Sequence, residues 1–196
     1  MTSRKIDRQG MARAVADFLS AAGLDPSSEL LSETARLTAD AWADEFLSGC
    51  SSDPMEPLSK KNLCVSSSSF TCPVVALRSI SYVSVCPHHL LPYEGLAHIA
   101  YIPGAEGLIA GFGSFVQVLD ILSHRLILQE VLASELCRTI ASSDLKPRHV
   151  FVRLEARQNC LALRGERRNE SLAVCEALTP HTPPEVSLLL RKALFP

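Results

Sequence analysis

Residues 84–95 read Ser84-Val-Cys86-Pro-His88-His89-Leu-Leu-Pro92-Tyr-Glu-Gly95, and the rest of the chain is organised around them. One thiol and two imidazoles fall within four residues, directly after an apolar run over residues 74–85. The loose alternation and β-branched side chains of that run predict a strand. Pro92 and Gly95 then turn the chain into a second predicted strand over residues 98–102. We therefore expect Cys86, His88 and His89 at a strand end, and thiolate and neutral imidazole are ligands that zinc prefers.

A zinc site needs a further ligand, and Cys160 is the best candidate in the rest of the sequence. It stands in Arg157-Gln-Asn-Cys160-Leu-Ala-Leu-Arg164-Gly, between two strand-like stretches. Cys86, one of the paired histidines and Cys160 would form a Cys2His set with the fourth position open to water, as in catalytic zinc sites. The spacing also allows the alternative of buried cysteines beside a core histidine, since short Cys/His clusters occur without metal.

Composition argues against several classes of protein. The chain has 196 residues, of which 47% are hydrophobic and 20% charged, and this suits one globular domain. A net charge of -2 and a pI near 6.3 argue against a nucleic-acid partner or an anionic membrane. No apolar segment is long enough to span a bilayer, and the charged N-terminus does not resemble a signal peptide. Seven cysteines, an odd number, indicate reduced thiols, so we expect a cytoplasmic protein.

Two helices are expected ahead of the strands. Residues 11–22 form the first, which Gly23 ends, and residues 33–47 form the second, which Gly49 ends. Residues 50–72 contain two prolines and the run Ser66-Ser-Ser-Ser69, which predict a linker or mobile loop. The chain is therefore predicted to have a helical extension over residues 1–49, a loop over residues 50–72 and a catalytic domain over residues 73–196.

The second half of the chain mixes helix and strand patterns. Apolar periodicity predicts one long helix over residues 111–141. Strands are predicted over residues 149–156, 160–164 and 171–178, and Thr182-Pro-Pro-Glu185 begins a closing helix that runs through Leu194. This order predicts an α+β fold with a largely antiparallel sheet.

These motifs resemble the GTP cyclohydrolase I family. Its core signature, Cys-x-His-His-Leu-x-Pro-[Phe/Tyr]-x-Gly followed by His-[Ile/Val]-x-Tyr-Ile-Pro, stands here at residues 86–95 and 98–103. Arg125, the pair Gln129-Glu130 and the stretch from Cys160 to Arg164 match in order and approximate spacing, and the N-terminal helix pair is also similar. The resemblance implies the tunnelling fold (T-fold), an antiparallel sheet backed by helices, in a toroidal homodecamer with sites between subunits.

The resemblance also implies a role for each site residue. Cys86, His89 and Cys160 would hold Zn2+, and zinc lowers the pKa of bound water, which favours hydrolysis at C8 of a purine. His88 would be the acid or base, since an unperturbed histidine titrates at a pH of about 6.5. Glu130 would pair with the N–H edge of guanine through its two oxygens. Further substrate contacts are expected from Gln129, Gln158 and Arg164.

Most of the cations with which this family binds a triphosphate are absent. The positions of the missing cations are Leu37 and Asp40 in the second helix, and Ser114 and Gln117 at the start of the long helix, where Gly113 replaces a serine of the family. Of the anion-binding set, Arg164 is the residue that remains. Because a triphosphate needs several charge-assisted partners, we expect GTP to bind poorly. The alternative is a shifted alignment, in which Arg36 or Arg138 supplies the missing charge.

Gln158 is a further departure, because the family usually has a histidine there that serves the later steps from opened ribose to pterin. We therefore predict a zinc-dependent hydrolase of this family that opens the imidazole-type ring of an unphosphorylated purine-like base or nucleoside. The main alternative is a genuine GTP cyclohydrolase I, which makes 7,8-dihydroneopterin triphosphate. An inactive structural or regulatory paralogue is a third hypothesis, and a nitrile reductase of the same fold is a fourth.

Overall fold

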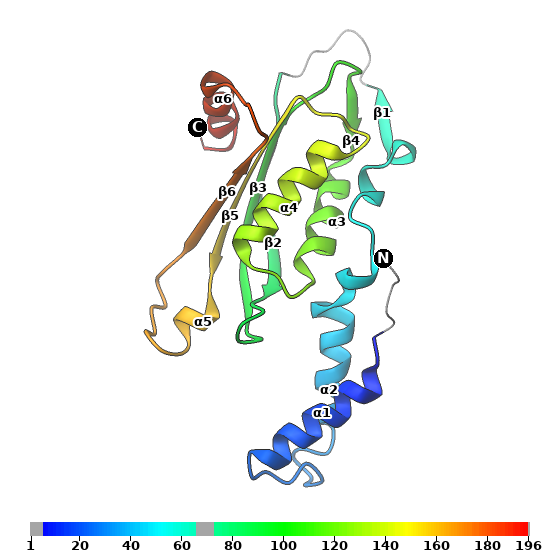
Figure 1. The fold of residues 1–196 in the computed structure, drawn as a ribbon, viewed down its shortest axis with the longest axis vertical. Coiled ribbons are helices and arrows are strands. Elements are labelled where there is room, and N and C mark those ends of the chain that lie inside the picture. Colours follow the sequence, from blue (N-terminus) through cyan, green and yellow to red (C-terminus); the bar gives the residue numbers. More distant parts are fainter. Residues whose placement is uncertain (1–5, 66–72, 196) are drawn as a thin grey trace.

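A four-stranded antiparallel sheet forms the centre of the protein (Figure 1). The computed structural model describes residues 6–65 and 73–195. The strands follow the order β2-β3-β5-β6, and each pairs with its neighbour in antiparallel register. Their bounds are Val75–Val85, Pro92–Ile102, His149–Arg157 and Ala173–Leu178. The predicted α+β class with an antiparallel sheet is therefore confirmed, and the predicted strand at residues 98–102 begins earlier, at Pro92.

Two helices, α3 (Phe112–Ser123) and α4 (Gln129–Ser142), cover one face of the sheet (Figure 1). The main hydrophobic core lies between them and the inward-facing residues of the strands. Its largest fully buried side chains include Tyr93, Tyr101, Phe115, Leu119 and Leu136. Burial of this apolar surface fixes the register of the strands, because a slip of one residue would turn each core side chain toward the other face.

The closing helix α6 (Pro184–Leu194) packs on the opposite face of the sheet, near one end (Figure 1). Leu190 and Leu194 bury a second, smaller core against Ala100 and Phe151. The predicted helix in this region is confirmed. Across residues 6–65 and 73–195, no helix combines the length and the apolar character that crossing a membrane requires.

The predicted N-terminal helix pair is present as α1 (Arg8–Ala21) and α2 (Thr34–Ala41), and a π-helical turn, η1 (Trp42–Phe46), continues α2. The pair projects away from the sheet as a hairpin (Figure 1). No residue of α1 is buried, so this helix is not part of the core. Arg8 of α1 forms ion pairs with Asp40 of α2 and with Asp44 of η1, and Arg36 contacts Asp40 within α2 at 3.1 Å.

The described part of the predicted linker is more ordered than a loop. It contains the 3-10 turns η2 (Ser48–Ser51), η3 (Glu56–Leu58) and η4 (Lys60–Asn62), followed by β1 (Leu63–Val65), which pairs with β4 (Leu108–Ala110). Leu58 is fully buried in the main core. The serine run from Ser66 to Ser69 lies outside the described residues, and the division of the chain into three parts stays a prediction.

The predicted long helix over residues 111–141 is wrong, because the chain leaves the helix between α3 and α4. The Ile127 N–H donates to the carbonyl of Val85 at 3.2 Å, and Leu126 forms a short parallel bridge with Val85. The link therefore pairs briefly with the end of β2. Apolar spacing alone predicts one helix, because α3 and α4 both turn an apolar face toward the same sheet.

The predicted strand over residues 160–164 is also wrong. A single helical turn, α5 (Asn159–Ala162), occupies this place, because the N–H groups of Leu161 and Ala162 both donate to the carbonyl of Gln158 at 2.9 Å. Figure 1 shows α5 and the turn between β2 and β3 at the same end of the sheet.

Candidate metal centre

The turn between β2 and β3 is closed by two backbone hydrogen bonds. The Cys86 N–H donates to the carbonyl of Leu91 at 3.0 Å, and the Leu90 N–H donates to the carbonyl of Cys86 at 2.9 Å. Leu90 takes a φ of 54° in order to close it, a conformation that is uncommon for a residue with a branched side chain. The turn therefore holds Cys86 and His89 on a constrained piece of backbone at the strand end, as the sequence predicts.

The structure brings together Cys86, His89 and Cys160. One ligand atom from each lies within 4.8 Å of the other two, and Cys86 Sγ lies 3.8 Å from His89 Nδ1. In a tetrahedral zinc site with Zn–S of about 2.3 Å and Zn–N of about 2.1 Å, neighbouring ligand atoms are about 3.6 Å apart. The three side chains therefore fit a divalent cation such as zinc, with a fourth position left for water or substrate.

Burial and the neighbouring Cys86 sulfur raise the pKa of the Cys160 thiol above its usual value. Cys86 itself is buried, Cys160 is half-buried and His89 is exposed. Two neighbouring thiolates in a poorly solvated place repel each other, and a bound cation reverses this balance because it favours the deprotonated ligands. The charge balance of the pair therefore suits a bound cation.

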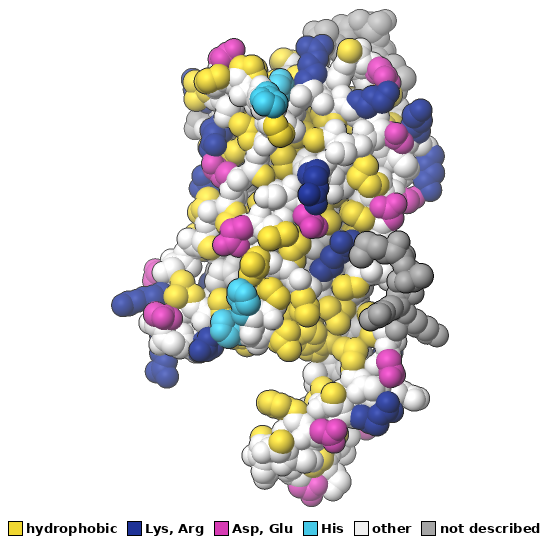
Figure 2. Space-filling view, in the orientation of Figure 1, with side chains coloured by type: hydrophobic (Ala, Val, Ile, Leu, Met, Phe, Trp, Pro, Cys, Tyr) yellow, Lys and Arg dark blue, Asp and Glu magenta, His cyan; other side chains and the backbone are white. Residues whose placement is uncertain are grey.

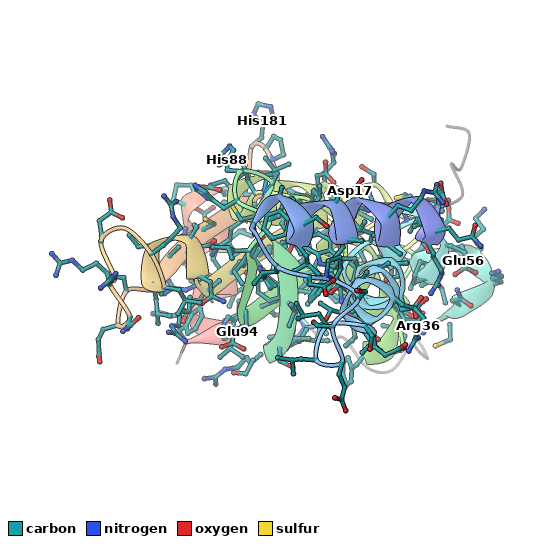
Figure 3. The ribbon with its side chains drawn as sticks, turned by 90° about the horizontal axis from the view of Figure 1, so that it is seen from below. Asp17, Arg36, Glu56, His88, Glu94 and His181 are labelled. Atoms are coloured by element: carbon teal, nitrogen blue, oxygen red, sulfur yellow. The ribbon has the colours of Figure 1, made fainter. Side chains whose placement is uncertain are left out.

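His88 is next to the metal-ligating group without belonging to it. Its ring centre lies 6.2 Å from that of His89, and the two rings are nearly perpendicular. The side chain is exposed, and Figure 3 shows it on the opposite side of the ribbon from Glu94. Histidine side chains are also exposed on the surface in Figure 2, near the end of the sheet that carries α5. His88 is therefore open to solvent beside the three side chains.

The predicted substrate residues differ in their surroundings. Glu130 is exposed in the first turn of α4, and its carboxylate has no hydrogen-bond partner within residues 6–65 and 73–195, while its backbone carbonyl accepts from Ser134. Arg164 is exposed just after α5. Gln129 is only 3% exposed, and its amide donates to the carbonyls of Leu154 at 3.1 Å and Ala173 at 2.9 Å.

Within the described part of the chain, few lysine or arginine side chains without an acidic partner lie near the positions at which triphosphate-binding cations are predicted to be missing. Asp40 pairs with Arg8 and Arg36, and α3 contains no lysine or arginine. Arg36 and Arg138, which could compensate, each contact an acid on their own helix: Arg36 lies 2.7 Å from Glu33, and Arg138 lies 3.7 Å from Glu135.

Sequence reasoning missed the hydrogen bonds of three side chains that fix the backbone. Tyr93 donates its hydroxyl to the carbonyl of Ile127 at 3.2 Å, and burial raises the pKa of Tyr93 to about 12. Asn159 donates to the carbonyl of Pro92 at 2.7 Å. Arg125 donates to the carbonyls of Gly49 and Ser52. Of these, Arg125 carried a signal, since it belongs to the pattern that precedes Gln129-Glu130.

Residues 11–185 match a sequence model described as GTP cyclohydrolase I. The chain belongs to the GTP cyclohydrolase I family. Curated relatives agree: "GTP cyclohydrolase 1" of Leifsonia xyli subsp. xyli is 39% identical over 162 residues, which cover 83% of this chain and 81% of the relative. "GTP cyclohydrolase 1" of Chromobacterium violaceum is 33% identical over 176 residues, which cover 88% of this chain and 80% of the relative.

A relative from Dehalococcoides mccartyi, also named "GTP cyclohydrolase 1", is 34% identical over 172 residues, with 88% of this chain and 87% of the relative covered. Among solved structures, that of "the archaeosine synthase QueF-Like in the apo form" gives a TM-score of 0.46 at 21% identity, over 58% of this chain and all of that chain. Family membership confirms the resemblance inferred from the motifs and supports hydrolysis as the class of chemistry.

Proposed function

We propose that this protein is a zinc-dependent hydrolase that opens the imidazole-type ring of a purine-like base or nucleoside without a triphosphate. The observation that carries the proposal is the convergence of Cys86, His89 and Cys160 from two distant parts of the chain, with His88 beside them. These three side chains would hold Zn2+, which supplies Lewis-acid activation of water and of the substrate. The site then has the ligand set and the open fourth position of a catalytic zinc.

The chain's own residues would provide proton transfer and recognition. His88 is exposed, so it can deliver or accept a proton at a ring nitrogen of the substrate. Glu130 presents a carboxylate without a competing hydrogen bond in the described chain, and two carboxylate oxygens match two adjacent N–H donors on a purine edge. The exposed Arg164 is available for an anionic or carbonyl group of the substrate.

The preference for an unphosphorylated substrate rests on the missing cations. Removal of one partner from a desolvated, charge-assisted contact costs about 2–5 kcal/mol. Four positions that are basic in the family carry none of that charge here, and Asp40 is committed to Arg8 and Arg36. Loss of this size at several positions leaves too little affinity for a triphosphate at useful concentrations.

A genuine GTP cyclohydrolase I is the second candidate. It is favoured by identities of 33% and 39% to relatives named "GTP cyclohydrolase 1" over more than four-fifths of this chain. In that case cations outside the aligned positions, or from a neighbouring copy of the chain, would have to bind the triphosphate.

The test is turnover by the zinc-loaded protein of GTP, guanosine, guanine, 8-oxoguanine and urate, followed by ultraviolet spectra and mass spectrometry. Cys160→Ser serves as the blank, and Cys50→Ser, which changes an exposed cysteine outside the cluster, serves as the matched control. We expect ring opening of a base or nucleoside while GTP stays intact. Conversion of GTP to a pterin would establish the second candidate instead. A protein that binds zinc but converts none of the five compounds would favour the inactive paralogue.

A further inference from the structure

Gln129 and Gln158 form an amide-to-amide hydrogen bond beside the metal ligands. Gln158 Nε2 lies 2.6 Å from Gln129 Oε1. Gln158 caps the N-terminus of α5, two residues before Cys160, and Gln129 is the first residue of α4, directly before Glu130. This bond therefore joins the turn that carries a metal ligand to the helix that carries the recognition carboxylate.

The orientation of both amides follows from their partners. The carbonyls of Leu154 and Ala173 can only accept, so the two N–H groups of Gln129 must face them. Gln129 Oε1 then remains as an acceptor, and Gln158 must present an N–H to it. Reversal of either amide would leave a buried acceptor facing another acceptor. The bridge is therefore fully satisfied in one arrangement, and Gln129 keeps no donor for a substrate.

A second amide fixes the same turn from the other side. Asn159, which follows Gln158, donates to the carbonyl of Pro92 at the start of β3. The two residues before Cys160 thus anchor it to α4 through one side chain and to β3 through the other. Both anchors meet backbone or side-chain groups that the sheet holds in place, so the Cys160 sulfur has little freedom relative to Cys86 and Glu130.

We propose that Gln158, through its hydrogen bond to Gln129, is a positioning residue that sets the place of Cys160 relative to Cys86, His89 and Glu130. Neither glutamine is then a direct substrate contact. The proposal rests on the proposed metal site, but it does not depend on the identity of the substrate.

The test compares cobalt(II) binding by wild type and by Gln158→Met, which keeps the length of the side chain and removes the donor. Outer partners of metal ligands typically contribute about 10- to 100-fold to metal affinity. We expect Q158M to bind cobalt more weakly by a factor in this range and to change its visible absorption bands, which report ligand geometry. Gln158→His retains an N–H donor at similar reach and should restore the wild-type affinity. Gln9→Met, an exposed glutamine on α1, is the matched control and should change neither quantity.

Thermal unfolding of the metal-free proteins separates positioning from a general loss of structure. Q158M should unfold within a few degrees of wild type, since the side chain is half-buried on a short turn; if Q158M does not fold, Gln158→Leu takes its place. The proposal would be overturned if Q158M had the cobalt affinity and spectrum of wild type. It would also be overturned if the loss of cobalt affinity were fully explained by a smaller fraction of folded protein. Failure of every purine substrate would count against the proposed function but would leave these metal measurements intact.

Discussion

At the scale of single residues, Asp40 bears both on the packing of the N-terminal helices and on the predicted loss of triphosphate binding. Its carboxylate lies 3.3 Å from Arg8 and 3.1 Å from Arg36, so it joins α1 to α2 at the surface. At the same time the sequence comparison with the family predicts that Asp40 replaces a cation that binds the triphosphate. The ion pairs give Asp40 a structural reason to be acidic in this chain, although exposed pairs of this kind contribute little to stability.

Restoration of the lost cations on α3 tests the phosphate argument directly. The double substitution Ser114→Lys and Gln117→Arg adds two positive charges on the first turns of a helix whose other residues stay unchanged. We expect GTP to bind at least tenfold more tightly, since one charge-assisted contact contributes about 1.5–3 kcal/mol. Isothermal titration with GTP and with guanosine measures the effect, and guanosine affinity should not change. Equal gains for both ligands would contradict the argument.

His98 makes stability depend on pH. It is 5% exposed, lies against Phe195, and its Nδ1 accepts from the N–H of Ser79 at 3.3 Å. Burial lowers the pKa of His98; among the charges that face it, Glu155 raises the pKa while Arg153 and Arg78 lower it. The folded chain therefore holds this proton more weakly than the unfolded chain. The free energy of unfolding should fall as the pH decreases below about 6.5 toward the lowered pKa.

His98→Asn removes the titrating group and keeps an acceptor near the place of Nδ1. Urea unfolding between pH values of about 7.5 and 5.5 should show a weaker decline in this variant than in wild type. His181→Asn is the matched control, because His181 is exposed at a φ of 59°, which asparagine tolerates. An unchanged decline in the His98 variant would assign the pH effect to another group.

Single residues also show what sequence reasoning reaches. Cys86 and His89 are three residues apart at a strand end, so their meeting could be predicted from local geometry. Cys160 could be named as the third ligand because it ends a distinct motif. The bridge between Gln129 and Gln158 could not be predicted, since it depends on the side-by-side placement of β5, β6 and α4, and amides of this kind are frequent on any surface. The roles assigned to His88, Glu130 and Arg164 stay predictions.

At the scale of elements, the break between α3 and α4 positions the site. A continuous helix would carry Gln129 and Glu130 past the end of β2, whereas the pairing of Leu126 and Ile127 with Val85 starts a new helix beside the metal turn. Periodicity cannot distinguish one helix from two that share an apolar face, and α5 is too short to show any period. The break, α5 and the short strands β1 and β4 therefore required the tertiary structure, while the four strands of the main sheet and the helices α1, α2 and α6 did not.

The contact between η2 and the end of α3 gives a prediction for Gly49. A Cβ at this position would lie 2.0 Å from the carbonyl oxygen of Ile121 and 3.0 Å from that of His124. Gly49→Ala should therefore lower the free energy of unfolding by about 1–3 kcal/mol, because backbone must move to admit the methyl group. Gly111→Ala is the control, since no atom lies within 4 Å of its Cβ position. Chemical denaturation of both variants gives the comparison, and equal stabilities would refute the close contact.

At the scale of the whole molecule, the sheet has two open edges, β2 and β6, within the described chain. An unpaired strand edge is a template for pairing with another chain, and exposed apolar side chains such as Val174 lie on β6. We expect a homo-oligomer, and the family resemblance predicts ten copies of the 21.3 kDa chain. Sedimentation velocity measures the mass directly.

Val174→Lys tests the role of the β6 edge in that assembly, because lysine on an edge strand disfavours pairing. The variant should sediment as a smaller species, while Val131→Lys, an exposed valine on α4, should not change the mass. A wild-type protein that sediments as a monomer at all concentrations would contradict the predicted assembly.

The N-terminal hairpin meets the body at its base, where Gly49 lies against α3 and Arg125 donates to the carbonyls of Gly49 and Ser52. The hairpin is therefore attached to the rest of the protein through a short contact at its base, so a small rotation there moves its far end. A helix of the length of α1 extends about 21 Å, so a rotation of about 10° at the pivot displaces its far end by about 4 Å. The close backbone contact at Gly49 therefore sets the direction in which the hairpin presents Phe18 and Leu30, which are 71% and 88% exposed.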